Sequence, residues 1–403
     1  MTIHKWQFTP RFRRNAFGWR SDTPIQRIKE AIAEIKLVAK KEPVIAAEGA
    51  VIFLEKLSPA IEGVDSSSGA IGSAVNRAIA TLVPIIAKAE FNPRTKQGWL
   101  ERLWAAVEED GIPYIESLGD YWGELCATKE TAAAWAERFL PTIEYAWSKE
   151  ASGHGFYKGT TACMSSLFAA GQYERLLALL EKAPLNWWYD RRWGVKALAA
   201  MGKNAEAIRY AEASRGLNDP GWQIAQECEA ILLSSGMKDE AYSRYALEAN
   251  QGTTNLSTFR AIKKKYPHKS APDILRDLVA SQPGAEGKWF AAAKDEGLFD
   301  LAIALVKQSP TDPRTLTRAA KDYGTEQPSF ALASGLAALR WISLGHGYEI
   351  TSLDVQDAYN ALKRAAPFAG ISEDSLKEQI RELLAKPHPG NPFMRSALDR
   401  QLS

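Results

Sequence analysis

The 403-residue sequence has few of the residues that build metal and redox centres. It contains three cysteines and five histidines, and none of them are paired at the spacing of a metal site. Cys126, Cys163 and Cys228 are too few for a disulfide framework. We therefore predict that the protein binds no metal and no cofactor, and that it resides in a reducing cytoplasm.

The usual catalytic and targeting signatures are also missing. The sequence has no His-Glu-x-x-His, no Cys-x-x-Cys and no Gly-x-Ser-x-Gly elbow, and no glycine-rich loop follows a strand pattern. No run reaches the roughly 18 to 20 apolar residues of a membrane span. Arginines interrupt the N-terminus where a signal peptide would be apolar. We expect a protein without a membrane span, and we assign no catalytic residues.

What the sequence does contain is a repeated helical hairpin, clearest between Trp193 and Ser214. Apolar residues recur there at three- and four-residue spacing on both sides of Gly202, which indicates two amphipathic helices joined by a glycine turn. Four glycines mark turns of this kind, namely Gly171, Gly202, Gly236 and Gly297. The successive intervals between them are 31, 34 and 61 residues. A period in the low thirties predicts stacked helical hairpins.

Each of these glycines is followed, five residues later, by Leu or Ala, and then by a larger apolar residue. With pairs such as Ala207-Ile208 and Ala302-Ile303, residues 160–310 resemble the tetratricopeptide repeat family. The tryptophan-rich helices before residue 150 look more like HEAT repeats, and the chain as a whole resembles bacterial helical-repeat proteins. This resemblance implies an all-α, right-handed α-solenoid, a shape rather than a chemistry.

We divide the chain accordingly. Residues 1–22 form a basic aromatic arm, residues 23–150 form HEAT-like hairpins, and residues 151–386 form tetratricopeptide-like repeats. The segment 151–160 is rich in small residues and marks the boundary. Residues 387–403 are expected to be a loose C-terminal tail.

Positive charge is concentrated in the arm. Residues 1–21 carry five basic residues and no acidic one, and subtracting these five from the 50 basic residues leaves 45 against 48 acidic residues. Arg11, Arg13 and Arg14 alternate there with aromatic residues. The arm is either a nucleic-acid-binding or acidic-partner-binding segment, or a segment whose rings anchor it to the first hairpins.

Glu116, Asp120 and Glu124 are spaced by four residues and would form one acidic stripe on a helix. Like charges at this spacing destabilise a helix, so they need partners. Nearby basic residues would provide them, or the stripe would receive the arginine arm. A metal site is less favoured because the stripe has no histidine.

Two further clusters are candidate binding sites. The segment 185–194 surrounds Arg191 and Arg192 with aromatic residues, namely Trp187, Trp188, Tyr189 and Trp193. This composition suits either ligand gripping by cation–π contact or aromatic packing in a core. The lysines at a helix end, Lys263, Lys264 and Lys265, are either solvated or a basic patch for phosphate.

We therefore predict a non-catalytic scaffold or adaptor that holds a protein or peptide on its concave face. The alternative is a helical-repeat protein that binds nucleic acid through the arm, Arg191, Arg192 and the three lysines. A DNA-processing enzyme is a more distant alternative, since some HEAT-like folds are DNA glycosylases.

Overall fold

The computed structural model describes residues 4–90, 92–148, 155–216 and 220–402. Within these ranges the chain forms 21 α-helices and four 3-10 helices and no strand, which confirms the predicted all-α class. Contacts divide the chain into two compact units, Met1–Ile231 and Leu232–Ser403, called unit 1 and unit 2 below. The division falls inside one helix, α11 (Gly221–Ser234).

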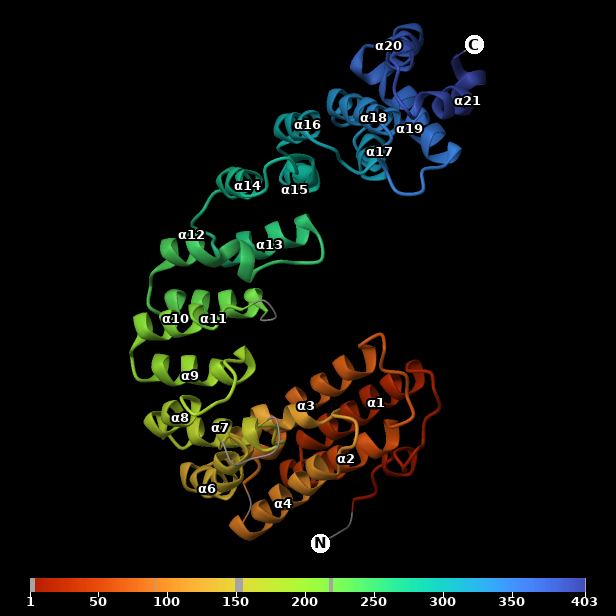
Figure 1. Ribbon diagram of the computed structural model, residues 1–403. Coiled ribbons are helices and arrows are strands. Elements are labelled where there is room, and N and C mark those ends of the chain that lie inside the picture. The colour runs from red at the N-terminus through yellow and green to blue at the C-terminus, as the bar shows by residue number, and fades with distance from the viewer. Residues whose placement is uncertain (1–3, 91, 149–154, 217–219, 403) are drawn as a thin grey trace. The chain divides into compact units, whose positions relative to one another are not determined.

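Unit 1 opens with a 3-10 turn and then a series of helices that pack mainly on their neighbours in sequence (Figure 1). Their bounds are η1 (Thr9–Arg11), α1 (Asp22–Ala39), α2 (Pro43–Ile61), α3 (Ala70–Lys88), α4 (Pro93–Glu109), η2 (Glu116–Tyr121), α5 (Trp122–Cys126), α6 (Lys129–Ala146), α7 (Thr160–Ala169), α8 (Tyr173–Leu180), α9 (Trp188–Ala200) and α10 (Asn204–Glu212). The helices α1, α2 and α3 contact one another, and α9 packs on both α8 and α10.

Among the described residues, α3 is the one helix long and apolar enough to cross a membrane. Its residues Ile71, Val75, Ile79 and Leu82 are fully buried, and the helix contacts α1 and α2. The apolar composition of α3 is therefore accounted for by packing inside unit 1.

The N-terminal arm packs on unit 1 through its aromatic rings. Trp6, Phe8 and Phe12 are buried. The rings of Phe8 and Phe12 pack edge-on against Phe53 of α2, at centroid distances of 5.4 and 5.0 Å. Glu34 of α1 accepts hydrogen bonds from two backbone N–H groups of the arm. The structure therefore favours the interpretation in which aromatic rings anchor the arm to the first hairpins.

The predicted glycine turns are present. Gly171, Gly202, Gly236 and Gly297 have φ angles of 74°, 77°, 76° and 71°. In each turn the residue after the glycine donates its N–H to the carbonyl five residues earlier, as Lys203 does to Leu198 at 2.9 Å. This is a helix-ending motif that favours glycine because its φ is positive. The same bond follows Gly345 and Gly370, which lie outside the repeated glycine pattern of the sequence.

Unit 2 continues the pairing of helices (Figure 1). Its elements after α11 are α12 (Lys238–Ala249), α13 (Asn255–Lys265), α14 (Ala271–Ala280), η3 (Glu286–Trp289), α15 (Phe290–Asp295), α16 (Phe299–Gln308), α17 (Pro313–Asp322), α18 (Pro328–Ser343), α19 (Ser352–Ala365), η4 (Pro367–Ala369), α20 (Glu373–Ala385) and α21 (Asn391–Leu402). The pairs α13–α14, α15–α16 and α17–α18 are hairpins, and α13 also contacts α15.

The prediction of a loose C-terminal tail is wrong for residues 391–402, which form α21. Met394 and Leu398 of α21 are fully buried, and the helix contacts α19 and α20. The Asn391 side chain donates to three carbonyls at the end of α20, at 2.7 to 3.2 Å. The apolar face of α21 is only two or three residues wide, too narrow to predict a helix without its packing partners.

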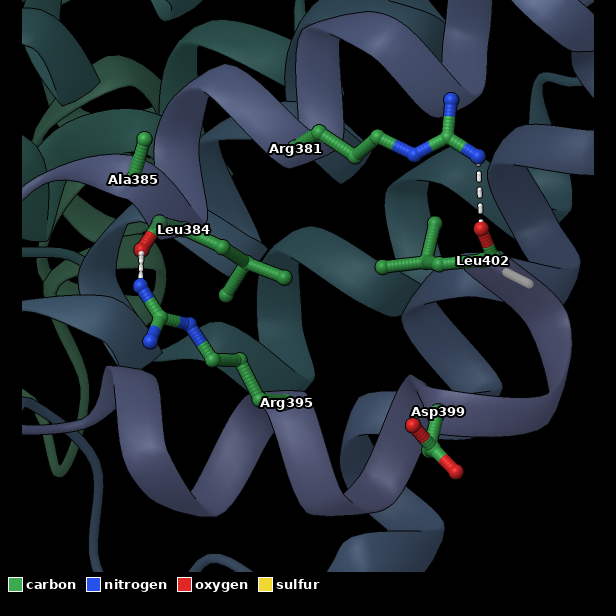
Figure 2. Close-up of a pocket in the computed structure, with 6 residues that line it drawn as sticks. All are labelled: Arg381, Leu384, Ala385, Arg395, Asp399 and Leu402. Carbon is green, nitrogen blue, oxygen red and sulfur yellow. Dashed lines mark hydrogen bonds between the residues drawn. The ribbon is translucent and has the colours of Figure 1, made fainter.

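Figure 2 shows two arginines whose guanidinium groups donate hydrogen bonds to backbone carbonyls near the C-terminal ends of α20 and α21. Arg395 donates to the carbonyl of Leu384 near the end of α20, at 2.5 Å. Arg381 donates to the carbonyl of Leu402, the last residue of α21, at 2.6 Å. These residues line an open cavity of about 410 Å³. Both guanidinium groups stabilise helix C-termini, so we assign this cavity to helix packing.

Candidate functional site

The aromatic segment and the acidic residue Asp120 come together in unit 1. Arg192 of α9 forms an ion pair with Asp120 of η2. The hydroxyl of Tyr189 donates to the same carboxylate at 3.3 Å. The Arg192 guanidinium also lies over the Tyr189 ring, 4.1 Å from its centroid, in cation–π geometry. These contacts join η2 to the N-terminus of α9.

Arg191 is also engaged inside the protein. Its Nε donates to Ser214 at 2.7 Å, its Nη1 donates to Asn186 at 3.2 Å, and its guanidinium lies 3.8 Å from the centroid of the Tyr210 ring. Trp188 and Trp193 of the same segment are buried, whereas Trp187 is 57% exposed. Of the aromatic residues in this segment, Trp187 and Tyr189 are exposed, and the hydroxyl of Tyr189 is engaged by Asp120.

A cavity of about 140 Å³ lies beside this segment, which we call the aromatic cavity. Its walls come from η2, the end of α6, the segment before α7 and the N-terminus of α9, and include Glu116, Trp147, Phe156, Tyr157, Lys158, Thr160, Leu185, Trp187, Tyr189 and Asp190. The indole N–H of Trp147 donates to the carbonyl of Gly155 at 2.9 Å and so connects two of these walls.

The charges around the aromatic cavity are unbalanced. Lys158 donates its ammonium to the carbonyls of Val107, Glu108 and Asp110 at the end of α4, and its charge opposes the effect of burial on the pKa of Glu116 without forming an ion pair with it. Glu116 and Asp190 have no hydrogen-bond or ion-pair partner among the described side chains. Burial raises the pKa of Asp190 to about 6 although Arg192 opposes the shift. Burial also raises the pKa of Glu116.

The acidic stripe does not have the predicted geometry. Glu116 and Asp120 belong to the 3-10 helix η2, whereas Glu124 belongs to α5, so the three do not share one α-helical face. Glu116 lines the aromatic cavity, Asp120 pairs with Arg192, and Glu124 is exposed. The loop from residue 111 to 115 precedes η2, and the helix changes from 3-10 to α geometry after Tyr121. This change separates the directions of the three acidic side chains along the chain.

The hypothesis that the stripe receives the arginine arm is wrong. Arg11 of the arm pairs with Glu30 of α1 at 2.9 Å. Arg13 and Arg14 are exposed and form no ion pair within the described chain. Burial of the arm's rings decides its path, because an exposed ion pair contributes little by comparison.

The lysine cluster lies at the C-terminus of α13. Lys263 binds the carboxylate of Glu296 with distances of 2.7 and 2.5 Å, and neighbouring Arg260 binds Asp295 at 2.9 and 2.6 Å. Both acids lie at the end of α15, next to the turn at Gly297. Lys264 and Lys265 are exposed. Part of the predicted basic patch is therefore neutralised by the next hairpin.

Unit 2 contains a larger groove of about 970 Å³ that the sequence reasoning missed. The first helices of three successive hairpins line it, together with the loop after α18. The lining residues include Asn255, Leu256, Lys288, Phe290, Lys294, Asp312, Thr315, Arg318, Asp322, His346 and Tyr348. Such an arrangement is typical of the inner surface of stacked helical hairpins.

Backbone and side-chain hydrogen bonds hold the walls of this groove in place. Gly287 donates its N–H to Ser309 at 2.7 Å, and Thr311 donates to the carbonyl of Gly287 at 2.9 Å. A β-carbon at Gly287 would lie 2.4 Å from the Ser309 carbonyl oxygen. Arg314 binds Asp354 and the carbonyl of Glu349, and so positions the loop that carries Tyr348.

The basic groups of the groove are largely free. The side chains of Lys288 and Arg318 make no hydrogen bond or ion pair within the described chain. Lys294 contacts only the ring of Tyr323, at 5.6 Å from its centroid. Two acidic residues, Asp312 and Asp322, also line the groove. Asp312 is the N-cap of α17, where its carboxylate accepts hydrogen bonds from the N–H and hydroxyl of Thr315. The groove therefore presents an apolar floor with a positive excess.

One sequence signal was available for the groove. The segment Gly345–Glu349 has two glycines around a histidine, a pattern typical of a turn between helices. It is a turn, and it also lines the groove through His346, Gly347 and Tyr348. Lys288, Lys294 and Arg318 could not be found in the same way, because only packing brings their helices together.

The described part of the chain contains no group of three or more metal-ligand side chains. All three cysteines are buried free thiols. Burial raises the pKa of Cys126 and Cys163 to about 12, which makes them unreactive. No protein-family model matches the sequence, and no curated protein shows significant similarity to it. The function must be inferred from these sites alone.

Proposed function

We propose that the protein is a non-catalytic helical-repeat scaffold that holds a segment of a partner protein in the groove of unit 2. The tetratricopeptide-like reading of residues 151–386 and the HEAT-like reading of residues 23–150 belong to this proposal, as does a cytoplasmic location. The groove carries the proposal, because its walls repeat from hairpin to hairpin and its size exceeds that of a single side-chain pocket.

The charges of the groove indicate the chemistry of the segment. Lys288 and Arg318 are free to bind carboxylates, with Lys294 between them in sequence. Tyr348, which is 79% exposed at the rim, offers an aromatic surface beside them. A peptide with acidic residues next to an apolar or aromatic residue would satisfy both features.

The experiment is a selection of random peptides displayed on phage against the full-length protein. We expect selected peptides to be rich in Asp and Glu, and to lose at least tenfold in affinity for the Lys288→Glu/Arg318→Glu variant. The matched control is Lys307→Glu/Lys386→Glu, which reverses two exposed charges outside the groove. Peptides that bind both variants and the native protein equally would refute the groove as the peptide-binding site. A selection that enriches no sequence would refute it as well.

The nucleic-acid alternative has less support, because three rings of the arm, Trp6, Phe8 and Phe12, are buried, and because Arg191, Arg192 and Lys263 have intramolecular partners. It is tested by fluorescence anisotropy with labelled single- and double-stranded DNA and RNA at several salt concentrations. Binding that falls steeply with salt and is lost on deletion of residues 1–21 would replace the scaffold proposal.

A further inference from the structure

The aromatic cavity of unit 1 has ring surfaces that no part of the described chain covers. Phe156 is 71% exposed and Trp187 is 57% exposed, and neither ring stacks on another ring of the described residues. Trp147 and Tyr157 line the same cavity, and Leu185, 48% exposed, extends the apolar surface. Large aromatic side chains left exposed around one cavity mark a binding site.

The polar groups of the cavity favour a cation. Glu116 and Asp190 lie beside these rings with no hydrogen bond or ion pair to their carboxylates in the described chain, although burying a carboxylate among apolar groups costs free energy unless a charge or donor compensates. The ammonium of Lys158 is held at the end of α4 and forms no ion pair with either carboxylate, so the charged residues of the cavity wall keep an excess of one negative charge. The hydroxyl of Thr160, a residue that is nine-tenths buried on the same wall, also has no hydrogen-bond partner among the residues that the structure describes.

The size of the cavity limits what it can hold. Its volume of about 140 Å³ is well below the roughly 300 to 1,000 Å³ of pockets for drug-sized ligands. A single cationic head group fits this volume. Metal ions are poorly matched, because Ca²⁺ and Mg²⁺ require about six or more oxygen ligands and the cavity wall is mostly aromatic.

We propose that the aromatic cavity binds an organic ammonium group, with the rings of Trp187 and Phe156 against its alkyl substituents and Glu116 and Asp190 balancing its charge. Alkylated ammonium groups spread their charge over a surface that contacts ring faces well, and cation–π attraction is strongest for tryptophan. The same head group occurs in small quaternary ammonium compounds and in trimethylated lysine side chains. This inference does not depend on the groove of unit 2.

The first test is a calorimetric titration of the full-length protein with tetramethylammonium chloride and with choline chloride, at constant ionic strength. The control ligand is 3,3-dimethylbutan-1-ol, which has the shape of choline without its charge. We expect saturable binding of both cations and binding of the neutral alcohol that is at least about tenfold weaker. Absence of saturable binding by either cation, or equal binding of the alcohol, would overturn the proposal.

Variants then locate the site. Trp187→Ala should weaken choline binding by about tenfold, while Trp187→Phe retains a ring and should lose less. Glu116→Gln and Asp190→Asn should each weaken it as well. The control is Trp19→Ala, a similarly exposed tryptophan (71%) in the arm, which should bind choline normally. Unfolding transitions of each variant show whether it is folded, and a folded Trp187→Ala protein with unchanged affinity would refute the site.

A third titration distinguishes the sources of the head group. It uses a short peptide that carries one trimethyllysine, and the unmodified lysine peptide as its control. Binding of the trimethylated peptide at least about tenfold tighter than choline assigns the cavity to a protein side chain. Equal or tighter binding of choline assigns it to a small quaternary ammonium compound.

Discussion

Gly49 of α2 lies directly against the indole ring of Trp6. A β-carbon built at position 49 would be 2.1 Å from Cζ2 of Trp6, far inside van der Waals contact. The missing side chain of Gly49 is therefore what allows the first ring of the arm to be buried, and the following rings of Phe8 and Phe12 continue along α2.

The variant Gly49→Ala should displace Trp6 and loosen the arm. Alanine is favoured over glycine in a helix by roughly 0.5 to 1 kcal/mol, but loss of a buried tryptophan contact outweighs this gain. We expect faster tryptic cleavage within residues 11–20, followed by mass spectrometry. Gly72→Ala in α3, where a β-carbon meets nothing within 4 Å, is the control. Equal cleavage of the two variants would show that Gly49 does not hold the arm.

The variant Gly202→Ala should destabilise the protein by roughly 1 to 2 kcal/mol, because φ at this turn is 77°. No neighbouring atom lies within 4 Å of a β-carbon there, so the cost comes from the backbone alone. Urea denaturation measures it. Gly98→Ala, in the interior of α4 and equally unobstructed, should instead stabilise by roughly 0.5 to 1 kcal/mol. Similar effects of the two substitutions would contradict the turn geometry.

The variant Arg192→Ala should destabilise unit 1 by about 2 to 4 kcal/mol, because it leaves Asp120 mostly buried without its counterion. Burial raises the pKa of Asp120 even with Arg192 present. The double variant Asp120→Asn/Arg192→Ala should lose less than the sum of the two single variants. The exposed pair Arg276–Asp273 is the control, and its Arg276→Ala variant should lose under about 1 kcal/mol. Additive losses at Asp120 and Arg192 would argue against their coupling.

The variant Asp190→Asn should be more stable than the native protein at neutral pH. The folded-state pKa of about 6 exceeds the ordinary value of 3.8, so the contribution of Asp190 to stability is present below about pH 4 and lost as pH rises through 6. The two proteins should have similar stability near pH 4 and differ by up to about 3 kcal/mol at pH 7, measured by urea denaturation.

Asp65→Asn provides a control of opposite sign. Hydrogen bonds from Ser67 lower the pKa of Asp65, so its contribution is present above the ordinary pKa and lost as pH falls. Its replacement should lower stability at pH 7 relative to pH 3. If the stability of Asp190→Asn relative to the native protein does not change between pH 4 and 7, Asp190 is not a buried unpaired carboxylate.

The sequence determined the local structure of this protein. Helical periodicity and the glycine turns predicted the all-α class, and the φ angles at Gly202 and its equivalents agree. Both signals arise from contacts and backbone conformations within one or two turns of chain, which a sequence contains completely. The resemblance to tetratricopeptide repeats rests on the same local pattern and stays a prediction.

The tertiary structure decided which charged and aromatic groups are free. Asp120 and Arg192, 72 residues apart, neutralise each other, whereas Lys288 and Arg318 are left open in a groove. Trp188 is buried and adjacent Trp187 is exposed. Charge and aromaticity are properties of single residues, but their availability depends on helix packing over long sequence distances. For this reason the candidate sites can be identified only from the tertiary structure.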